Sequence, residues 1–198
     1  MSLYGRWFSS QAISLALREK VGLKHGVDIV VRRRDGSIKD ERHYGDIKDG
    51  VKRKIKDSFF ARLWKRFISR QCVMSDLITN AGKASVAGLI LTDIVEADYD
   101  YLAIGTGTVA PAVTDTALGV ETHRVAGTGT LVTTTVTNDT AQLVSIFSGF
   151  TGTEAVTEVG MFNAATVGGM LMRQTFAALN VNWDLGDSIE MTVKIAVS

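Results

Sequence analysis

From Tyr99 to the end of the chain, apolar and polar residues alternate with a period of two. In the clearest run, DSIEMTVKIAV, every second residue from Ile189 to Val197 is apolar. This pattern predicts a β-strand with one buried face, because successive side chains of a strand point to opposite faces. Further predicted strands are YDYLAIG, LVTTTVTN, AQLVSIFSG, AVTEVGMFN and MLMRQTFA. Short strands separated by turns such as Asn138-Asp139 and Gly168-Gly169 favour an antiparallel β-sandwich.

Residues 27–43 carry the signal of a β-hairpin. Two extended runs, VDIVVRRR and SIKDERHY, flank the dipeptide Asp35-Gly36. We expect a type I′ turn at this dipeptide, because Asp-Gly tolerates the positive φ that both central residues of that turn require. Before the hairpin, a short helix is predicted over residues 10–21, with Gly22 just past its end. The apolar stripe of this helix consists of Ile13, Leu17 and Val21.

Residues 47–70 form the clearest predicted helix, because apolar residues recur there every four positions. The stripe consists of Ile47, Val51, Ile55, Phe59, Leu63 and Phe67, and it is widened by Phe60, Trp64 and Ile68. Basic residues crowd the remaining surface: Lys52, Arg53, Lys56, Arg62, Lys65, Arg66 and Arg70. A second helix, rich in small residues, is predicted over residues 81–91.

Composition divides the chain near residue 80. Of the 20 threonines, only Thr79 precedes that point. Residues 1–80 hold 18 Lys and Arg against 9 Asp and Glu, whereas residues 81–198 hold 4 against 12. We therefore predict an α+β chain with two parts. Residues 1–75 would form a basic helical anchoring arm with the 27–43 hairpin, and residues 76–198 a Thr/Gly-rich, mainly antiparallel β-sandwich.

The sequence contains no pattern typical of secretion or membrane insertion. The first 20 residues lack the continuous apolar core of a signal peptide, and no run of 18 apolar residues predicts a transmembrane helix. Cys72 is the single cysteine, which excludes an internal disulfide framework and a cysteine-based zinc site. We expect Cys72 to be a small buried hydrophobe in a protein made in a reducing cytoplasm.

The glycine-rich segment Gly105-Thr106-Gly107-Thr108 is the one stretch that invites a phosphate-loop interpretation. No Gly-Lys-Ser/Thr follows it, and the final glycine of a dinucleotide fingerprint is missing. We predict a tight turn or β-bulge after the preceding strand, where glycine lets two backbones approach closely.

Other candidate chemistry is sparse. Four acidic residues follow one another closely, but their spacing does not match a calcium loop: Asp93, Glu96, Asp98 and Asp100. His25, His43 and His123 have no carboxylate or serine pattern around them, and we expect surface or structural histidines. We find no catalytic motif and predict a non-enzymatic protein without cofactor or metal.

The basic, aromatic helix is the strongest functional lead. Four roles are open for it: binding another protein, an ordinary solvated face over a core-facing stripe, binding nucleic acid, and lying on a membrane surface. Exposed aromatic side chains of this size usually mark interfaces. The predicted partner-binding residues are Phe59, Phe60, Leu63, Trp64, Phe67, Arg62, Lys65 and Arg66.

Several stretches together resemble a widespread family of tailed-bacteriophage virion proteins, commonly described as structural, tail-fibre-like or minor head proteins. They are DLITNAGKASVAGLI, YDYLAIGTGTVAPAVTDTALGVETHR and the long run from VTNDTAQLV to EMTVKI, so the resemblance covers about residues 76–197. Its motifs are the NAG segment, the IGTGT-AP-TDTAL run, the TE-G-FNAA turn and the final GDS strand. HGVDIVVRRRDGSIKDERHY also resembles the leading hairpin of such proteins, whereas residues 47–70 are an insertion.

The resemblance implies a non-enzymatic β-sandwich of the virion, assembled in the host cytoplasm as a capsid decoration, minor head or tail-fibre-like component. Its partners would be other virion proteins and further copies of itself, with a trimer as one option. Contact with packaged DNA is a further expectation, and no membrane association is expected. Two alternatives stay open: a nucleic-acid-contacting protein of the head interior or connector, and a carbohydrate-binding receptor module. The receptor module would need an exposed aromatic platform, and Trp183 is the only tryptophan after residue 75.

Overall fold

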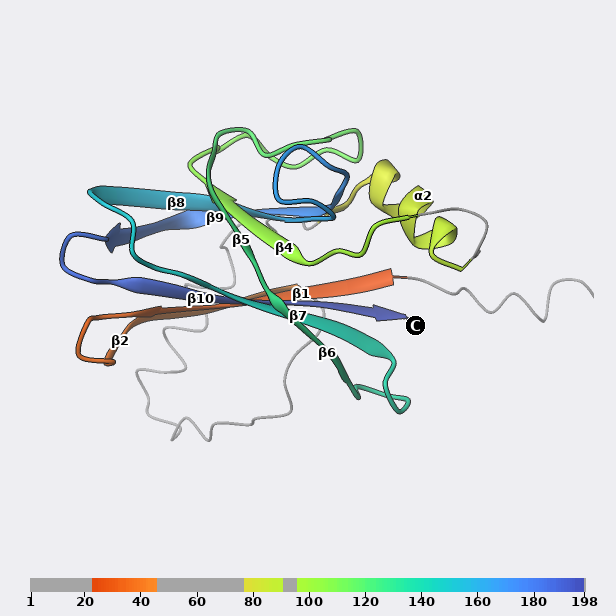
Figure 1. The fold of residues 1–198 in the computed structure, drawn as a ribbon, viewed down its shortest axis with the longest axis horizontal. Coiled ribbons are helices and arrows are strands. Elements are labelled where there is room, and N and C mark those ends of the chain that lie inside the picture. The colour runs from red at the N-terminus through yellow and green to blue at the C-terminus, as the bar shows by residue number, and fades with distance from the viewer. Residues whose placement is uncertain (1–22, 46–76, 91–95, 198) are drawn as a thin grey trace, which may run out of the picture.

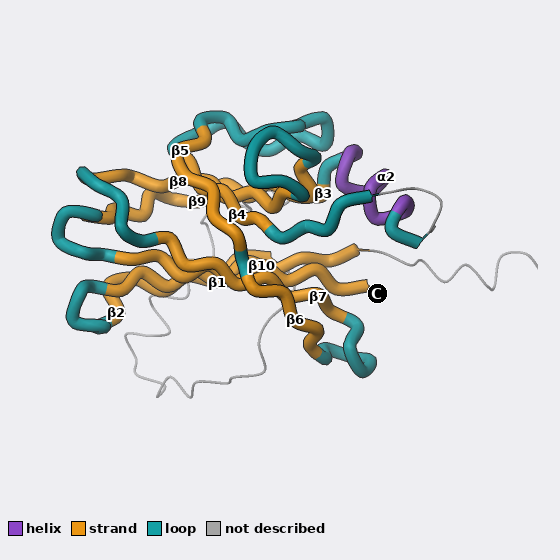
Figure 2. Tube along the Cα trace, viewed as in Figure 1, coloured by secondary structure: helices purple, strands orange, loops and turns teal. Residues whose placement is uncertain are grey.

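Two antiparallel β-sheets lie face to face in the computed structural model, which describes residues 23–45, 77–90 and 96–197 (Figure 1). Sheet A has the strand order β2-β1-β10-β7-β6, and sheet B has the order β3-β9-β8-β4-β5. Within these residues one short helix, α2, lies at one end of the two layers (Figure 2). The predicted helices at 10–21 and 47–70 lie outside the described residues, as does Cys72.

Each sheet combines strands that are far apart in the sequence. Sheet A consists of β1 (Leu23–Arg32), β2 (Ile38–Gly45), β6 (Thr128–Val132), β7 (Thr140–Phe147) and β10 (Ser188–Val197). Sheet B consists of β3 (Leu77–Ile78), β4 (Tyr101–Gly105), β5 (Glu121–Ala126), β8 (Thr153–Phe162) and β9 (Met170–Asn182). Helix α2 (Asn80–Gly88) follows β3 almost directly.

One hydrophobic core fills the space between the sheets, which agrees with the predicted β-sandwich. Alternate residues of the strands supply it, as the period of two predicts. Sheet A contributes Val27, Ile29, Val31, Leu143, Phe147, Ile189, Met191 and Val193. Sheet B contributes Leu102, Ile104, Val156, Val159, Met172 and Leu179.

The predicted hairpin is present, but its turn and its place differ from the prediction. Only Gly36 has a positive φ (81°), and five residues separate β1 from β2, so the turn is not a two-residue type I′ turn. The amide N–H of Gly36 instead donates to the carbonyl of Arg33. Strand β1 pairs with β10 from Leu23↔Val197 to Arg32↔Ser188 and lies inside sheet A. The hairpin therefore belongs to the sandwich, and its assignment to an anchoring arm is wrong.

Most predicted strands are confirmed, namely β4, β7, β8, β9 and β10. The predicted strand 131–138 is wrong beyond Val132, where the chain forms a loop. The Asp139 carboxylate organises that loop by accepting backbone N–H bonds from Thr134, Thr135 and Val136, all at 2.8 Å. These bonds lower the pKa of Asp139, and Asn138 adopts a positive φ of 61° beside it. Strands β3 and β5 were not predicted.

A single extended segment passes from sheet B to sheet A at one edge of the sandwich. Strand β5 pairs with β4, and β6, only one residue later, pairs with β7 in the other sheet. Gly127 is the pivot, and its N–H donates to the Asp100 carbonyl at 2.8 Å. A Cβ at this position would meet the Leu143 side chain at 2.6 Å, so the crossing depends on glycine.

Helix α2 confirms the predicted second helix, although it begins at Asn80 and ends at Gly88. The Thr79 hydroxyl caps it by accepting a hydrogen bond from the Gly82 N–H at 2.9 Å. Gly82 lies so close to the β9 backbone that an added Cβ would overlap Leu171. The small residues of the helix thus allow close packing against sheet B.

Ile29→Ala tests whether β1 is part of the core. Ile29 is buried in sheet A, so this substitution should lower the free energy of unfolding by about 2–5 kcal/mol. Ile146→Ala, at a position that is 59% exposed in the same sheet, should cost less than about 1 kcal/mol. Urea unfolding monitored by circular dichroism measures both, and equal losses would contradict the placement of β1.

Candidate functional site

The predicted partner-binding residues lie outside the described part of the chain. All of them fall within residues 46–76: Phe59, Phe60, Leu63, Trp64, Phe67, Arg62, Lys65 and Arg66. What the structure shows is where this segment joins the sandwich. It leaves the end of β2, the outermost strand of sheet A, and returns at β3, the outermost strand of sheet B. The segment is thus inserted between two edge strands.

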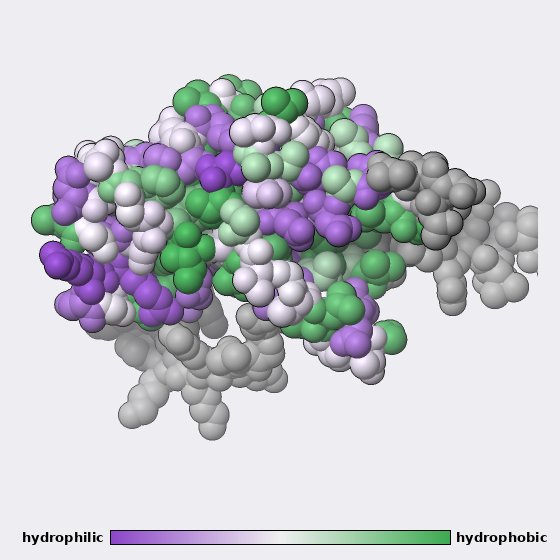
Figure 3. All heavy atoms as spheres, viewed as in Figure 1, coloured by the Kyte–Doolittle hydropathy of each residue, from purple (hydrophilic) through white to green (hydrophobic). Residues whose placement is uncertain are grey.

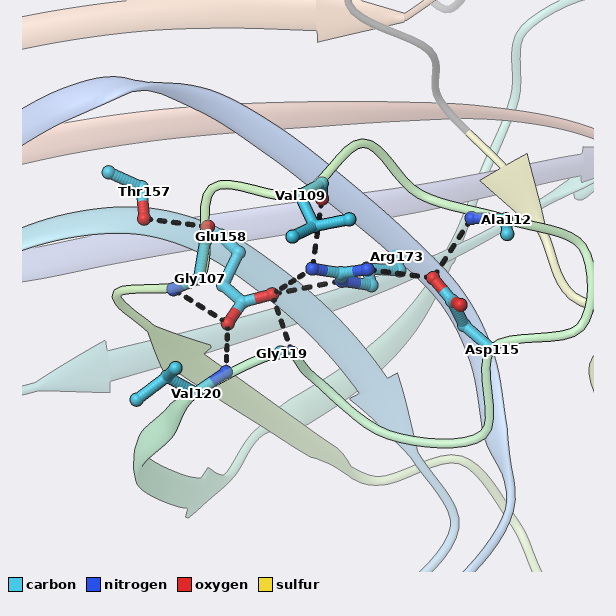
Figure 4. Close-up of polar contacts among 9 residues, drawn as sticks. All are labelled: Gly107, Val109, Ala112, Asp115, Gly119, Val120, Thr157, Glu158 and Arg173. Carbon is cyan, nitrogen blue, oxygen red and sulfur yellow. Dashed lines mark hydrogen bonds and ion pairs between the residues drawn. The ribbon is translucent and has the colours of Figure 1, made fainter.

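A buried ion pair links two neighbouring strands of sheet B. Glu158 of β8 is 0% exposed and Arg173 of the neighbouring strand β9 is 3% exposed. The Arg173 guanidinium donates from Nε to Glu158 Oε2 at 2.9 Å, and its NH2 lies 2.8 Å from the same oxygen. Both side chains lie on the outer side of sheet B, beneath residues 106–120 (Figure 4).

The pair holds the 106–120 loop against the sheet. Backbone N–H groups of Gly107, Gly119 and Val120 donate to the Glu158 carboxylate at 2.9, 3.0 and 2.8 Å. On the other side, Arg173 binds Asp115 at 2.7 Å and the Val109 carbonyl at 3.1 Å. The Asp115 carboxylate also accepts a hydrogen bond from the Ala112 N–H. Both ends and the middle of the loop are therefore fixed by two side chains of the sheet.

Electrostatics keeps this group ionised. Burial by itself would raise the pKa of Glu158, but the N–H groups of Val120 and Gly119 and the Arg173 guanidinium lower it below its usual 4.5. Burial likewise raises the pKa of Asp115, but the Ala112 N–H and the Arg173 guanidinium outweigh burial, so the pKa is lowered from its usual 3.8. Since each Glu158 oxygen already accepts at least two hydrogen bonds, this carboxylate positions the loop.

Glycine makes these contacts possible, as the sequence predicted for the Gly105–Thr108 segment. The pairing of β4 with β5 shifts between Ile104 and Gly105, which confirms the predicted bulge. An added Cβ at Gly105 would overlap the Val120 carbonyl, and one at Gly107 would overlap the Glu158 carboxylate. The motif is therefore required for close backbone approach.

The described histidines take part in structural contacts. His43 binds Asp28 across the hairpin, and the His123 ring stacks on Phe150 with centroids 3.7 Å apart. Phe150 also contacts Trp183 edge-on at 5.3 Å, and the indole N–H donates to Glu154 at 3.2 Å. Trp183 is only 4% exposed and presents no open ring face.

Among residues 23–45, 77–90 and 96–197, no three His, Cys, Asp or Glu side chains gather as metal ligands. Glu96, Asp98 and Asp100 belong to these ranges, whereas Asp93 does not. Across the same residues, no helix has the length and apolar character to cross a membrane.

Glu158, Arg173 and Asp115 are not among the site residues predicted from the sequence. A usable signal was present, because TEVGMF and MLMRQT each place one charged residue within a predicted core strand. Buried charges are almost always paired, so an acid and a base in consecutive central strands predict an ion pair.

Glu158→Gln tests the ion pair. The variant leaves Arg173 without its buried counter-charge, so the free energy of unfolding at pH 7 should fall by about 3–5 kcal/mol. The pKa values of Glu158 and Asp115 are lowered in the folded protein. The stability that these two carboxylates contribute is therefore fully present at a pH above their ordinary pKa values of 4.5 and 3.8. It is lost as the pH falls through their lower pKa values in the folded state. The variant should therefore show a weaker loss of stability between pH 5 and acid, as its carboxylate no longer titrates.

The matched control for this variant is Glu190→Gln, a half-buried position of β10. It should change stability by about 0.5 kcal/mol or less. The double variant Glu158→Gln/Arg173→Met should unfold less readily than Glu158→Gln, because no buried cation is left unpaired and the Gln carbonyl oxygen can still accept the N–H bonds of the loop. Urea titrations at several pH values measure all of these, and a Glu158→Gln protein as stable as Glu190→Gln would refute the account.

Gly107→Ala tests the close approach of the Gly107 backbone to the Glu158 carboxylate. The added methyl group must displace the Glu158 carboxylate, so we expect a loss of about 1–3 kcal/mol. Gly129→Ala in β6 is the control, because nothing lies within 4 Å of the added Cβ there. Thermal unfolding of the two variants compares them, and equal melting temperatures would contradict the packing described.

No protein-family model, curated protein or solved structure matches this chain.

Proposed function

We propose that the chain is a non-enzymatic structural protein of a tailed-bacteriophage virion. Its β-sandwich is mounted on the particle, as a capsid decoration, minor head or tail-fibre-like component, through the basic aromatic helix predicted at 47–70. In this proposal the β-sandwich, called the body below, is the folded part of the subunit, and residues 46–76 attach it to the particle. The hairpin at 27–43, which the sequence assigned to the arm, belongs to the body in this proposal.

The position of the insertion is the observation that supports this proposal best. In the sequence, residues 46–76 connect β2 to β3, and each of these strands is the outermost strand of its sheet. The central pair of sheet A, β1 and β10, is formed by residues outside this segment. An insertion between edge strands interrupts no ladder of the described sheets. Its aromatic stripe can then meet a neighbouring subunit while the sandwich keeps its core.

Charge separation supports the same division. The described residues contain 10 Lys and Arg against 15 Asp and Glu, a net charge of −5. Residues 46–76 contain nine basic and four acidic residues, a net charge of +5. A basic segment on an acidic body attracts acidic neighbours, including the bodies of further copies. Virion proteins occur in many symmetric copies, so weak contacts can add to stable attachment.

A nucleic-acid-contacting protein of the head interior or connector is the second candidate, and the charge of residues 46–76 favours it. Phosphate contacts make log affinity fall steeply with log salt, whereas aromatic docking persists. A carbohydrate-binding receptor module gains no support from Trp183, because that ring is enclosed by Phe150 and His123.

The test uses purified virions of the virus that encodes the chain. Mass spectrometry should find the full-length protein in them at a constant copy number. Incorporation of Phe59→Ser/Trp64→Ser should drop about tenfold or more, since each buried aromatic contributes on the order of 2 kcal/mol. Circular dichroism should show an unchanged fold. Absence of the chain from purified particles would refute the proposal.

A charge variant serves as the matched control. Arg62→Gln/Lys65→Gln/Arg66→Gln keeps the aromatic stripe and removes three charges. Under the proposal it should weaken attachment at low salt and have little effect at 0.5 M NaCl, where charge contacts are screened over about 4 Å. If this variant alone abolishes incorporation, and the wild-type protein binds a 30-base-pair duplex with a steep salt dependence, the nucleic-acid function replaces the structural one.

A further inference from the structure

An apolar cleft opens between the two sheets at the end of the sandwich that carries α2. Its volume is about 560 Å³, and both sheets and the helix contribute side chains. Leu23 and Val197 come from the adjacent ends of β1 and β10, and Met161 comes from β8. Val86 comes from α2, and Leu89 follows directly after its last residue. The cleft is therefore an extension of the core that reaches the surface.

The opposite end of the sandwich carries an aromatic cluster. There, Phe150 and Trp183, from the β7–β8 and β9–β10 connections, pack together against the core. At the cleft, large apolar side chains stay in contact with solvent: Leu89 is 45%, Leu131 63% and Val197 54% exposed. In Figure 3, hydrophobic residues reach the surface beside α2 where the two layers part. An exposed apolar patch joined to a cleft typically binds an apolar partner.

We propose that this cleft seats the N-terminal segment of the same chain, with the stripe of Ile13, Leu17 and Val21 facing its apolar floor. Leu23 lines the cleft and is the first residue of β1, so the stripe is tethered at the cleft itself. Residues four apart lie on one face of a helix, and Gly22 permits the sharp change of direction between Val21 and Leu23. A tether this short gives an effective concentration on the order of millimolar.

Charge favours the same occupant. Asp98, Asp100 and Asp139 line the cleft, and none of its described lining residues is Lys or Arg. Residues 1–22 contain three basic residues and one acidic residue, a net charge of +2. Arg18 and Lys20 flank the stripe and can approach these carboxylates while Leu17 and Val21 are buried. An apolar stripe beside cations thus matches an apolar floor beside anions.

This inference is independent of the proposed virion function. It assigns the two predicted helices of the N-terminal region different tasks. Residues 10–21 cover the body of their own chain, which leaves the aromatic helix at 47–70 as the segment available to a partner.

The experiment uses the full chain with Cys72→Ser and a nitroxide spin label on Ser14→Cys, a position beside the stripe. Methyl signals of Leu131, Met161 and Val197 should broaden in the labelled protein, while those of Leu179 and Val181 should not. In a mixture of spin-labelled chains with isotope-labelled chains that carry no nitroxide, no broadening should appear. Broadening in that mixture would show that a second copy supplies the segment, and it would overturn the assignment.

Two variants examine the contact from each side. Leu17→Asp in the segment and Leu131→Asp at the rim should each speed amide hydrogen exchange of residues 13–21 by about tenfold or more. Leu131 is 63% exposed, so its variant should leave the core intact. Leu185→Asp, at a position 69% exposed in the β9–β10 turn, is the control and should change nothing. Exchange in the wild type as fast as in an unfolded peptide would also overturn the proposal.

Discussion

The pairing of β1 with β10 is the interaction on which the rest of the structure depends. These strands join residues 23–32 to residues 188–197 in an unbroken antiparallel register, in the middle of sheet A. Their inward residues supply much of one wall of the core. Because this contact spans nearly the whole sequence, the sandwich cannot complete sheet A until its last strand is present. A boundary at residue 75 would remove β1 and leave β10 with a bare edge, so the body begins at the hairpin and not after it.

Composition alone placed that boundary incorrectly, for a physical reason. The basic residues that follow the hairpin, and the Arg32–Arg34 run within it, share one charge sign, so a charge count merges them. Strand membership depends instead on alternation, and Val27, Ile29 and Val31 alternate as clearly as the residues of β10. The hairpin belongs to the sheet because its apolar face has nowhere else to be buried. Charge describes what a surface attracts, whereas periodicity describes what it packs against.

The sequence predicted the strands that bury one complete face, and it failed where burial is partial. Strand β5 is exposed or half-buried along its length, so ETHRVA shows no alternation to detect. Strand β3 has two residues and is defined by its partner β9. The threonine run after Val132 has high strand propensity, but the Asp139 carboxylate binds its backbone N–H groups and forms a loop instead. The ion pair between Glu158 and Arg173 was also not predicted, because it forms only when β8 and β9 are neighbours in the sheet.

The 106–120 loop shows why a buried ion pair stands where apolar packing would be simpler. The loop consists largely of Gly, Thr, Ala and Val, and of its larger apolar side chains only Leu118 is buried, beside Phe162 and Met170. Hydrophobic burial therefore stabilises its position only weakly. A carboxylate that accepts N–H groups from both ends of the loop sets the position by direction and distance, which apolar contacts cannot do. A buried pair contributes little net stability compared with apolar side chains of the same shape. We therefore infer that its role here is to specify one loop conformation. That ordered loop covers the outer side of sheet B, so this sheet is buried on both faces where β8 and β9 meet it.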